Sequence, residues 1–341
     1  MLGPRSTTSV FRTLTHLVNV ATDEISSPQP RLSVLFFWLS PPEQLLQIIS
    51  DQLLHQIPPQ RPHPRWPPPK KPSRSPPAGR VAIITLNNPK KLNAMNQPNY
   101  YRLSCLLQDV AVMPDITVTV LTGTGRFFSA GADVTTTRPG VDATSPHQQR
   151  DQLLRGFVIN NLDCTRSFYT HPKILVCALN GPTVGLSAAL LGFCDFIYAT
   201  PHAWFLTPFS SLGLVAEGGA SAGLVQRMGI AKANEALLTS RKISCEELVA
   251  CGFVNKVFSG KDEKDSAGFL EKVLEEVEDR FGSHLNQESL LKIKELIRRP
   301  FLEGLESQGV REVMAGMERF KSGAPQEEFR KIASGEKKHK L

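Results

Sequence analysis

Three glycine-rich segments contain the residues of this sequence whose types suit catalysis. They read RFFSAGAD at 126–133, NGPTVGLSAA at 180–189 and LGLVAEGG at 212–219. Gly131 and Gly185 have no side chain, so a ligand can approach the backbone closely at both positions. The amides of the next residues, Ala132 and Leu186, would then point at one oxygen atom and form an oxyanion hole suited to a thioester enolate.

The same spacing is also typical of two tight turns between a strand and a helix. If residues 186–193 are helical, the Leu186 amide lies at the positive end of the helix dipole, which favours a negatively charged oxygen there. Spacing alone leaves both interpretations open for Ala132 and Leu186.

Glu217 is the carboxylate of the third segment, with apolar residues 214–216 before it and two glycines after it. A carboxyl group with few polar neighbours keeps its proton more readily, which suits a general base that later returns the proton. The alternative is an acid in the first turn of a helix that begins near residue 219, where its charge favours the helix dipole.

Other motifs argue against hydrolase, dinucleotide and metal sites. Residues 219–223 (GASAG) match the GxSxG pattern of hydrolases, but that pattern needs a strand just before the serine, and residues 214–219 make a poor strand. Gly123 and Gly125 lack the third glycine of a dinucleotide fingerprint, because Phe128 stands there. The six cysteines show no CxxC spacing and the eight histidines no HxxxH spacing. We therefore expect buried free thiols, no metal site and no separate cofactor.

The segments around these motifs predict an α/β fold. Short apolar, β-rich runs predict strands at 81–86, 117–121, 174–178, 196–199 and 254–257. Apolar residues with a period of 3.6 predict helices at 103–111, 150–168 and 266–281. Because strands alternate with helices and the end of the chain is mainly helical, we expect an α/β domain with a helical C-terminal region.

Charge and hydropathy argue against two classes of partner. The 341 residues include 39 lysines and arginines against 32 aspartates and glutamates, a net charge of +7. Residues 1–79 and 330–341 each have a net charge of +4, which leaves −1 for residues 80–329. The middle of the chain therefore lacks a basic face for nucleic acid. The longest apolar run near the start, 34–39, is too short for a membrane span.

Composition divides the chain into four parts. Fifteen of the 26 prolines lie before residue 80, and ten of them within 58–77, which favours polyproline II over a packed fold. We expect a disordered proline-rich leader at 1–79, a core at 80–260, a helical region at 261–330 and a basic tail at 331–341. The first 22 residues contain arginines, serines and threonines but no acid, in the manner of a mitochondrial transit peptide.

Six motifs, taken in order, resemble the crotonase (enoyl-CoA hydratase/isomerase) superfamily. They are ITLNNP at 84–89, LNAM at 92–95, FSAGAD at 128–133, NGPTVG at 180–185, ISCEEL at 243–248 and GFVN at 252–255. The resemblance covers residues 80–330, about three quarters of the chain. It implies a spiral of ββα units followed by helices that form trimers. Ala132 and Leu186 fall on the family's two oxyanion-hole positions, so the resemblance favours that interpretation of them.

The superfamily catalyses several reactions, and its acid–base residues distinguish them. Where hydratases have two glutamates, this sequence has Ala189 and Phe209, so addition of water is not expected. Glu217 instead stands in the segment where hydratases read Pro-Gly-Ala-Gly-Gly. This placement is similar to that in the Δ3,Δ2-enoyl-CoA isomerases of fungal peroxisomes.

The resemblance implies that Glu217 moves a proton from C2 to C4 of a fatty 3-enoyl-CoA and gives the 2-trans-enoyl-CoA of β-oxidation, with CoA as part of the substrate. The predicted substrate contacts are Ser129, Ala130, Gly131, Ala132, Asp133 and Leu186. Four apolar residues either line the acyl chain or pack in the core; they are Phe205, Leu206, Phe209 and Leu212.

The resemblance also implies homotrimers or hexamers and a cellular address. The tail His339-Lys340-Leu341 is similar to the Ser-Lys-Leu tripeptide, which implies a peroxisomal import receptor and a peroxisomal location, with the mitochondrion as the alternative. Family members usually have another strand before Val81, where this sequence is rich in proline, so we expect an unpaired sheet edge.

Three rival functions stay open at this point. Dienoyl-CoA isomerisation is a related reaction that usually adds a second acid near the acyl tail. A non-catalytic acyl-CoA-binding protein would keep the fold without the chemistry. RNA binding through the basic tails would depend steeply on salt and would not need Glu217.

Overall fold

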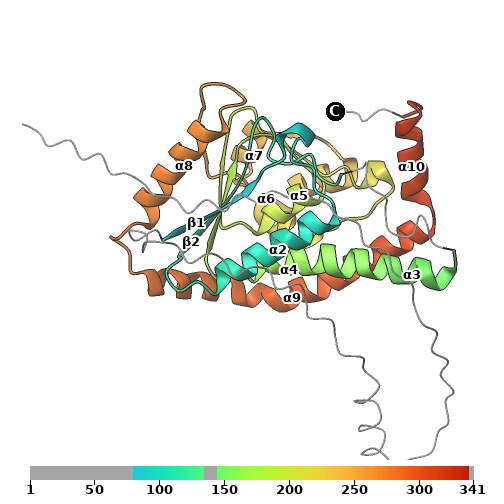
Figure 1. Ribbon diagram of the computed structural model, residues 1–341, viewed down its shortest axis with the longest axis horizontal. Helices are drawn as coiled ribbons and strands as arrows, with labels where there is room; N and C mark the ends of the chain where they lie inside the picture. The colour runs from blue at the N-terminus through green and yellow to red at the C-terminus, as the bar shows by residue number, and fades with distance from the viewer. Residues whose placement is uncertain (1–79, 134–143, 338–341) are drawn as a thin grey trace, which may run out of the picture. The chain divides into compact units, whose positions relative to one another are not determined.

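The computed structural model describes residues 80–133 and 144–337 and shows helices packed around a sheet (Figure 1). The expected leader, 1–79, and the tripeptide His339-Lys340-Leu341 lie outside the described residues. In the part of the chain that is described, no helix combines the length and apolar composition needed to cross a membrane.

The main sheet is parallel and has the strand order β1-β2-β3-β5-β8. Its strands are β1 (Val81–Leu86), β2 (Val118–Gly123), β3 (Ile174–Leu179), β5 (Phe196–Ala199) and β8 (Lys256–Val257). The β2 and β3 strands are buried along their whole length, as expected for parallel strands covered on both faces. The predicted strands are thus confirmed, and among the described residues β1 forms an edge of the sheet.

A smaller sheet pairs β4 (Thr183–Val184) with β6 (Trp204–Leu206), and β6 with β7 (Ile243–Ser244). The loops after β2 and β3 leave the main sheet at the same edge, because parallel strands end on the same side. Both glycine-rich segments with the candidate amides follow these two strands directly. The order of the strands therefore brings the two segments side by side.

The helical elements follow the strands in the order that the sequence predicts. They are α2 (Gln97–Ala111), α3 (Pro146–Leu154), α4 (Cys164–Tyr169), α5 (Leu186–Leu190), α6 (Ala220–Thr239), α7 (Cys245–Ala250), α8 (Ser266–Phe281), α9 (Gln287–Lys321) and α10 (Ala324–Ala333), with short 3-10 turns η1 (Pro89–Lys91), η3 (Leu191–Phe193) and η4 (Ser210–Leu212). A π-helix, η2 (Arg155–Asp163), joins α3 to α4, so the helix predicted at 150–168 forms with a π-helical middle.

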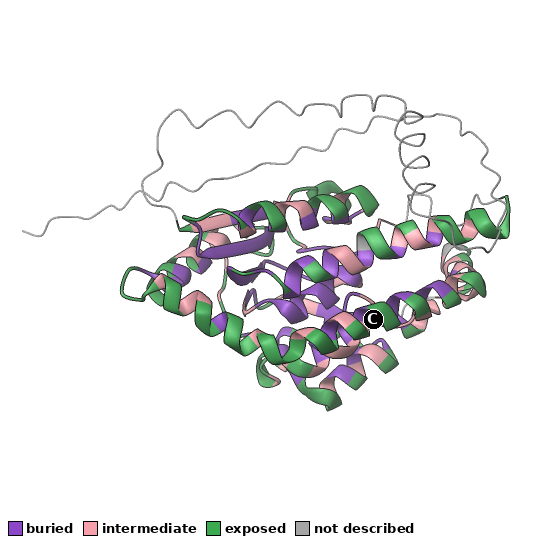
Figure 2. Cartoon of the chain, turned by 90° about the horizontal axis from the view of Figure 1, so that it is seen from below, coloured by how far each residue is buried: buried purple, intermediate pink, exposed green. Residues whose placement is uncertain are grey.

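The two faces of the main sheet pack on different helices. Alternate strand residues face opposite sides, and Ile83, Val120 and Val176 pack with the apolar stripe of α8, which includes Phe269 and Val273. The other face packs in a larger cluster with residues of α2, α5 and α6. Buried residues accordingly gather on the strands and on the inner sides of the helices (Figure 2). The helix predicted at 266–281 is confirmed as α8.

A buried ionic cluster fastens α9 to the sheet. Asp195, just before β5, accepts hydrogen bonds from Lys294 Nζ at 2.6 Å and Arg298 Nη2 at 2.8 Å. Its carboxylate also accepts from the Leu175 amide at 2.8 Å. Burial opposes ionisation of Asp195, but the positive charges of Lys294 and Arg298 outweigh it and hold the pKa of Asp195 below its ordinary value.

Replacing Asp195 with asparagine is expected to lower the free energy of unfolding by about 3 kcal/mol, because two largely buried cations lose their counter-charge. Urea denaturation measures this loss. Asp151→Asn is the control, since Asp151 pairs with Arg155 at the surface and its loss is expected to cost less than about 1 kcal/mol. Equal losses in the two variants would contradict this role for the cluster.

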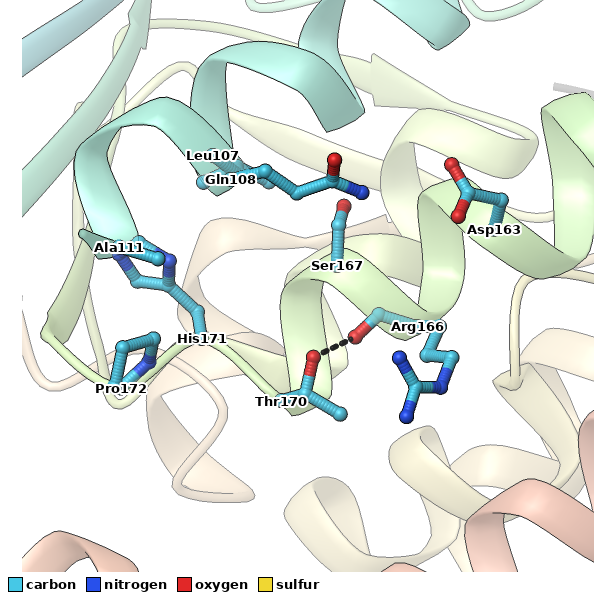
Figure 3. A pocket seen from close by; sticks show the side chains of 9 residues that line it. All are labelled: Leu107, Gln108, Ala111, Asp163, Arg166, Ser167, Thr170, His171 and Pro172. Atoms are coloured by element: carbon cyan, nitrogen blue, oxygen red, sulfur yellow. Dashed lines mark hydrogen bonds between the residues drawn. The ribbon is translucent and has the colours of Figure 1, made fainter.

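His171, after α4, is a second buried polar group, with a ring Nε2 2.8 Å from the Thr119 hydroxyl. Its side chain faces a cavity of about 170 Å³ between α2 and α4 (Figure 3). Burial, and then the charge of Lys294, lowers the pKa of His171 to about 3. The cavity is lined by Leu107, Gln108, Ala111, Asp163, Arg166, Ser167, Thr170, His171 and Pro172. None of the predicted site residues is among them.

The free energy of unfolding is expected to fall as the pH drops from about 6.5 toward 3, because the unfolded chain binds a proton at His171 that the folded chain excludes. The slope from this group is up to about 1.4 kcal/mol per pH unit. His171→Gln removes the titration but keeps a polar side chain opposite Thr119. Urea denaturation between pH 7 and pH 4 should give a shallower slope for the variant, and parallel slopes would contradict the assignment.

Candidate active site

The two segments with the candidate amides are joined by backbone pairing. Ser129 and Thr183 form a parallel bridge in which the Val184 amide donates to the Ser129 carbonyl at 3.0 Å. The first of these segments also pairs with residues before α2, because Ala132 forms a parallel bridge with Met95. The loops after β2 and β3 therefore lie against each other, as the predicted oxyanion hole requires.

Gly131 explains why this approach is so close. A Cβ on Gly131 would lie 2.7 Å from the Val184 carbonyl oxygen, a distance too short for any side chain. Gly131 and Gly185 also have φ values of +86° and +65°, which favour glycine. The structure thus explains why glycine stands at positions 131 and 185.

The backbone pairing between these segments does not use the amides of Ala132 and Leu186. In the bridge to Met95, the Met95 amide donates to the Gly131 carbonyl and the Asp133 amide donates to the Met95 carbonyl, so the Ala132 amide faces away from Met95. Leu186 is the first residue of α5, where an amide has no acceptor within the helix. Apart from the regular pairing within helices and strands, neither amide donates a hydrogen bond to a backbone carbonyl in the part of the chain that the structure describes. Their geometry fits the predicted role.

Buried hydroxyls lock the two segments together. The Ser129 hydroxyl donates to the Asn93 carbonyl at 2.9 Å and lies 2.9 Å from the Ser187 hydroxyl, on α5. The Tyr100 hydroxyl lies 3.3 Å from Ser187 as well. The Ser129 side chain is therefore engaged within the protein, and the whole residue is buried, with its amide paired to the Pro182 carbonyl and its carbonyl paired to the Val184 amide. Next to Ala132, the carboxylate of Asp133 accepts from Lys91 Nζ at 2.8 Å.

Glu217 lies in the loop between η4 and α6, two residues before Gly219, which caps α6. The first turn of α6 contains no acid, so the alternative of a first-turn acid is wrong. The reason is local: Gly218 and Gly219 both have φ near +70°, which keeps Glu217 outside the helix. The GASAG segment lies at the start of α6, with no strand before its serine, which agrees with the rejection of a nucleophile elbow.

Asn161, on η2, holds the Glu217 carboxylate. Asn161 Nδ2 donates to Glu217 Oε2 at 3.0 Å, and the Gly218 amide donates to Asn161 Oδ1 at 3.1 Å. The sequence analysis missed Asn161, and it also expected few polar neighbours for Glu217. An amide donor stabilises the ionised carboxylate. No motif marks this asparagine, and its significance comes from a contact 56 residues away in the chain.

The loop that contains Glu217 rests on α5. A Cβ on Gly218 would lie 2.5 Å from Leu186 Cδ1 and 3.2 Å from Ala189 Cβ. Burial raises the pKa of Tyr100, and the negative charge of Glu217 raises it further, which also indicates that the carboxylate is near the buried hydroxyls. The fold therefore brings Ala132, Leu186 and Glu217 into one region.

The residues proposed as walls for the acyl chain are mostly interior. Phe205, Leu206 and Phe209 are buried, and Phe205 packs edge-on against Phe253 with ring centroids 5.3 Å apart. Core packing explains these three, whereas Leu212 is partly exposed.

Known proteins resemble this chain in sequence and in fold. Residues 78–287 match the family described as enoyl-CoA hydratase/isomerase. A Pyricularia oryzae protein named Delta(3,5)-Delta(2,4)-dienoyl-CoA isomerase is 57% identical over 272 residues, covering 77% of this chain and 96% of the relative. A Saccharomyces cerevisiae 3,2-trans-enoyl-CoA isomerase is 32% identical over 266 residues, covering 77% and 94%. The crystal structure of an enoyl-CoA hydratase/isomerase from Pseudoalteromonas atlantica T6c matches with a TM-score of 0.64 and 27% identity, over 77% of this chain and 96% of that one.

The fold is therefore the α/β fold of the crotonases, with a helical C-terminal region, as the sequence predicted. The chain belongs to the enoyl-CoA hydratase/isomerase family and, within it, to the enoyl-CoA isomerases.

If Glu217 is the acid–base group that the sequence predicts, Asn161→Ala is expected to lower the rate of double-bond isomerisation about a hundredfold, because the carboxylate loses the hydrogen bond that orients it. The growth of absorbance from a conjugated enoyl thioester measures the rate. Asn255→Ala is the matched control, since Asn255 accepts from the Ile197 amide away from Glu217. Equal rates in Asn161→Ala and the wild type would exclude an orienting role.

Proposed function

We propose that this protein converts 3-cis- and 3-trans-enoyl-CoA to 2-trans-enoyl-CoA, with Glu217 as its acid–base group. The observation that supports this most directly is the Glu217 carboxylate, oriented by Asn161 in a loop that rests on Leu186. A carboxylate held beside two candidate amide donors is what proton transfer next to a thioester needs.

In the proposed reaction, Glu217 removes a proton from C2 of the substrate. The electron pair of that C–H bond moves into the C2–C1 bond, and the thioester oxygen becomes a dienolate oxygen. The amides of Ala132 and Leu186 donate hydrogen bonds to this oxygen. The protonated Glu217 then returns the proton to C4, and the double bond shifts from C3–C4 to C2–C3.

One carboxylate is enough for this reaction because C2 and C4 are only two bonds apart. Water addition would need a second acid–base residue, and the two positions at which the family's hydratases have glutamates are Ala189 and Phe209, both buried here. This supports isomerisation over hydration within the proposed family chemistry.

A second candidate is the isomerisation of 3,5-dienoyl-CoA to 2,4-dienoyl-CoA, favoured by the name of the 57% identical Pyricularia oryzae relative. That reaction delivers the proton to C6, four bonds from C2. A single carboxylate at a fixed position spans this distance poorly, so the reaction calls for a second acid near the acyl tail, and we assign none.

The proposal also includes the assembly and location that follow from the resemblance. We infer a homotrimer or hexamer that binds fatty enoyl-CoA over the turn at 129–133. We also infer import into peroxisomes through His339-Lys340-Leu341, with the mitochondrion as the alternative.

Glu217→Gln is expected to lower turnover of 3-hexenoyl-CoA about a thousandfold, because the amide cannot accept the C2 proton. The two substrates to compare are 3-hexenoyl-CoA and 3,5-octadienoyl-CoA, whose conjugated products absorb at different wavelengths. Glu306→Gln is the matched control, since Glu306 pairs with Arg166 at the surface. Circular dichroism confirms that each variant is folded.

Faster turnover of 3,5-octadienoyl-CoA by the wild type would favour the second candidate. A folded wild type that binds acyl-CoA but converts neither substrate would contradict both reactions and favour a non-catalytic acyl-CoA-binding protein.

A further inference from the structure

We propose that Glu312, on α9, is a positioning residue that holds the loop of the acid–base group, residues 213–219, in place. The inference rests on the proposed role of Glu217. It makes α9 part of the machinery that sets where the carboxylate lies relative to Leu186.

Glu312 accepts three hydrogen bonds at the start of α6. The Gly219 amide donates to Glu312 Oε2 at 2.7 Å. The Ser221 amide donates to Glu312 Oε1 at 2.9 Å, and the Ser221 hydroxyl donates to the same oxygen at 2.5 Å. Gly219 caps α6 without a side chain of its own, so a carboxylate 93 residues away takes the place of an ordinary N-cap.

The burial of Glu312 indicates that these bonds matter. The residue is 6% exposed, and burial raises its pKa against the opposing effect of the three donors. A buried carboxylate is costly unless hydrogen bonds satisfy it. Among the described residues, its partners are two amides and a hydroxyl rather than a lysine or arginine. An apolar residue at position 312 would leave the Gly219 and Ser221 amides without their acceptor.

The loop needs outside support because it has no side chains at its critical bend. Gly218 and Gly219 have φ values of +70° and +69°, and a Cβ on Gly219 would lie 2.5 Å from Phe193 Cζ. Two consecutive amides after Glu217 are instead held from outside, that of Gly218 by Asn161 and that of Gly219 by Glu312.

The two holding elements, η2 and α9, pack directly on each other. A Cβ on Gly309 would lie 2.9 Å from Leu162 Cδ1, and one on Gly316 would lie 2.7 Å from Phe157 Cε1. Asn161 and Glu312 therefore belong to one rigid support, and a change at either end is expected to move the bend at 218–219.

This arrangement also explains the serine of the GASAG segment. The Ser221 hydroxyl donates to Glu312 and accepts from Gln308 Nε2 at 2.9 Å. Both partners come from α9, so the serine fastens α6 to that helix.

The test compares Glu312→Gln with Ser221→Ala and with Glu276→Gln. The glutamine places an NH2 group against a backbone donor, whereas Ser221→Ala removes only one of the three donors. Glu276 is the matched control, because it is also a buried glutamate but pairs with Lys256 on β8 and Arg280 on α8. Three readouts are taken from the full-length protein: kcat and KM for 3-hexenoyl-CoA, the melting temperature, and amide hydrogen exchange of peptides that cover 213–223.

We expect Glu312→Gln to lower kcat at least tenfold with KM unchanged within twofold, and to speed amide exchange in 213–223 alone. Ser221→Ala should show the same pattern with a smaller effect. Glu276→Gln should lower the melting temperature without either change. Normal exchange in 213–223, or faster exchange with normal kcat, would overturn the proposal.

Failure of the proposed function gives a different result. A wild type inactive on 3-hexenoyl-CoA and on 3,5-octadienoyl-CoA would contradict both proposed reactions. Amide hydrogen exchange in residues 213–223 would still decide whether Glu312 holds the loop.

Discussion

The candidate site depends on one close backbone contact, in which Gly131 lies against the Val184 carbonyl. Any side chain at Gly131 would collide with that oxygen, so the contact exists only because glycine stands there. It brings the loops after β2 and β3 together at the edge where parallel strands end. The buried hydroxyls of Ser129 and Ser187 then fasten the two loops. The positions of the Ala132 and Leu186 amides follow from these contacts.

The proposed acid–base group, Glu217, reaches this region by a different route. Glu217 comes from a third loop, residues 213–219, that contains three glycines in the left-handed region. Helical elements hold it, with Asn161 on one side and, in our proposal, Glu312 on the other. The helix that contains Glu312 is itself fastened to the sheet by the Asp195 cluster. The attachment of α9 to the sheet and the position of the Glu217 loop are thus physically connected.

Much of the fold and the choice of candidate residues could be predicted from the sequence, because both depend on local patterns. Short β-branched runs predicted the strands, and a periodic apolar stripe predicted α8. Asn161 and Glu312 belong to no motif, and each matters through contacts with residues far away in the chain. The role of Phe205 could not be predicted for a different reason. An apolar residue suits a substrate wall and a core equally well until its burial is known.

The central claim is that one carboxylate both removes and returns the proton. Its most direct test uses 3-hexenoyl-CoA with deuterium at C2 and follows the label by NMR during the first turnovers in ordinary water. Transfer by Glu217 alone predicts that part of the deuterium appears at C4 of the 2-trans-enoyl product. Product formed with no deuterium at C4 would contradict a single carboxylate and require separate groups for the two steps.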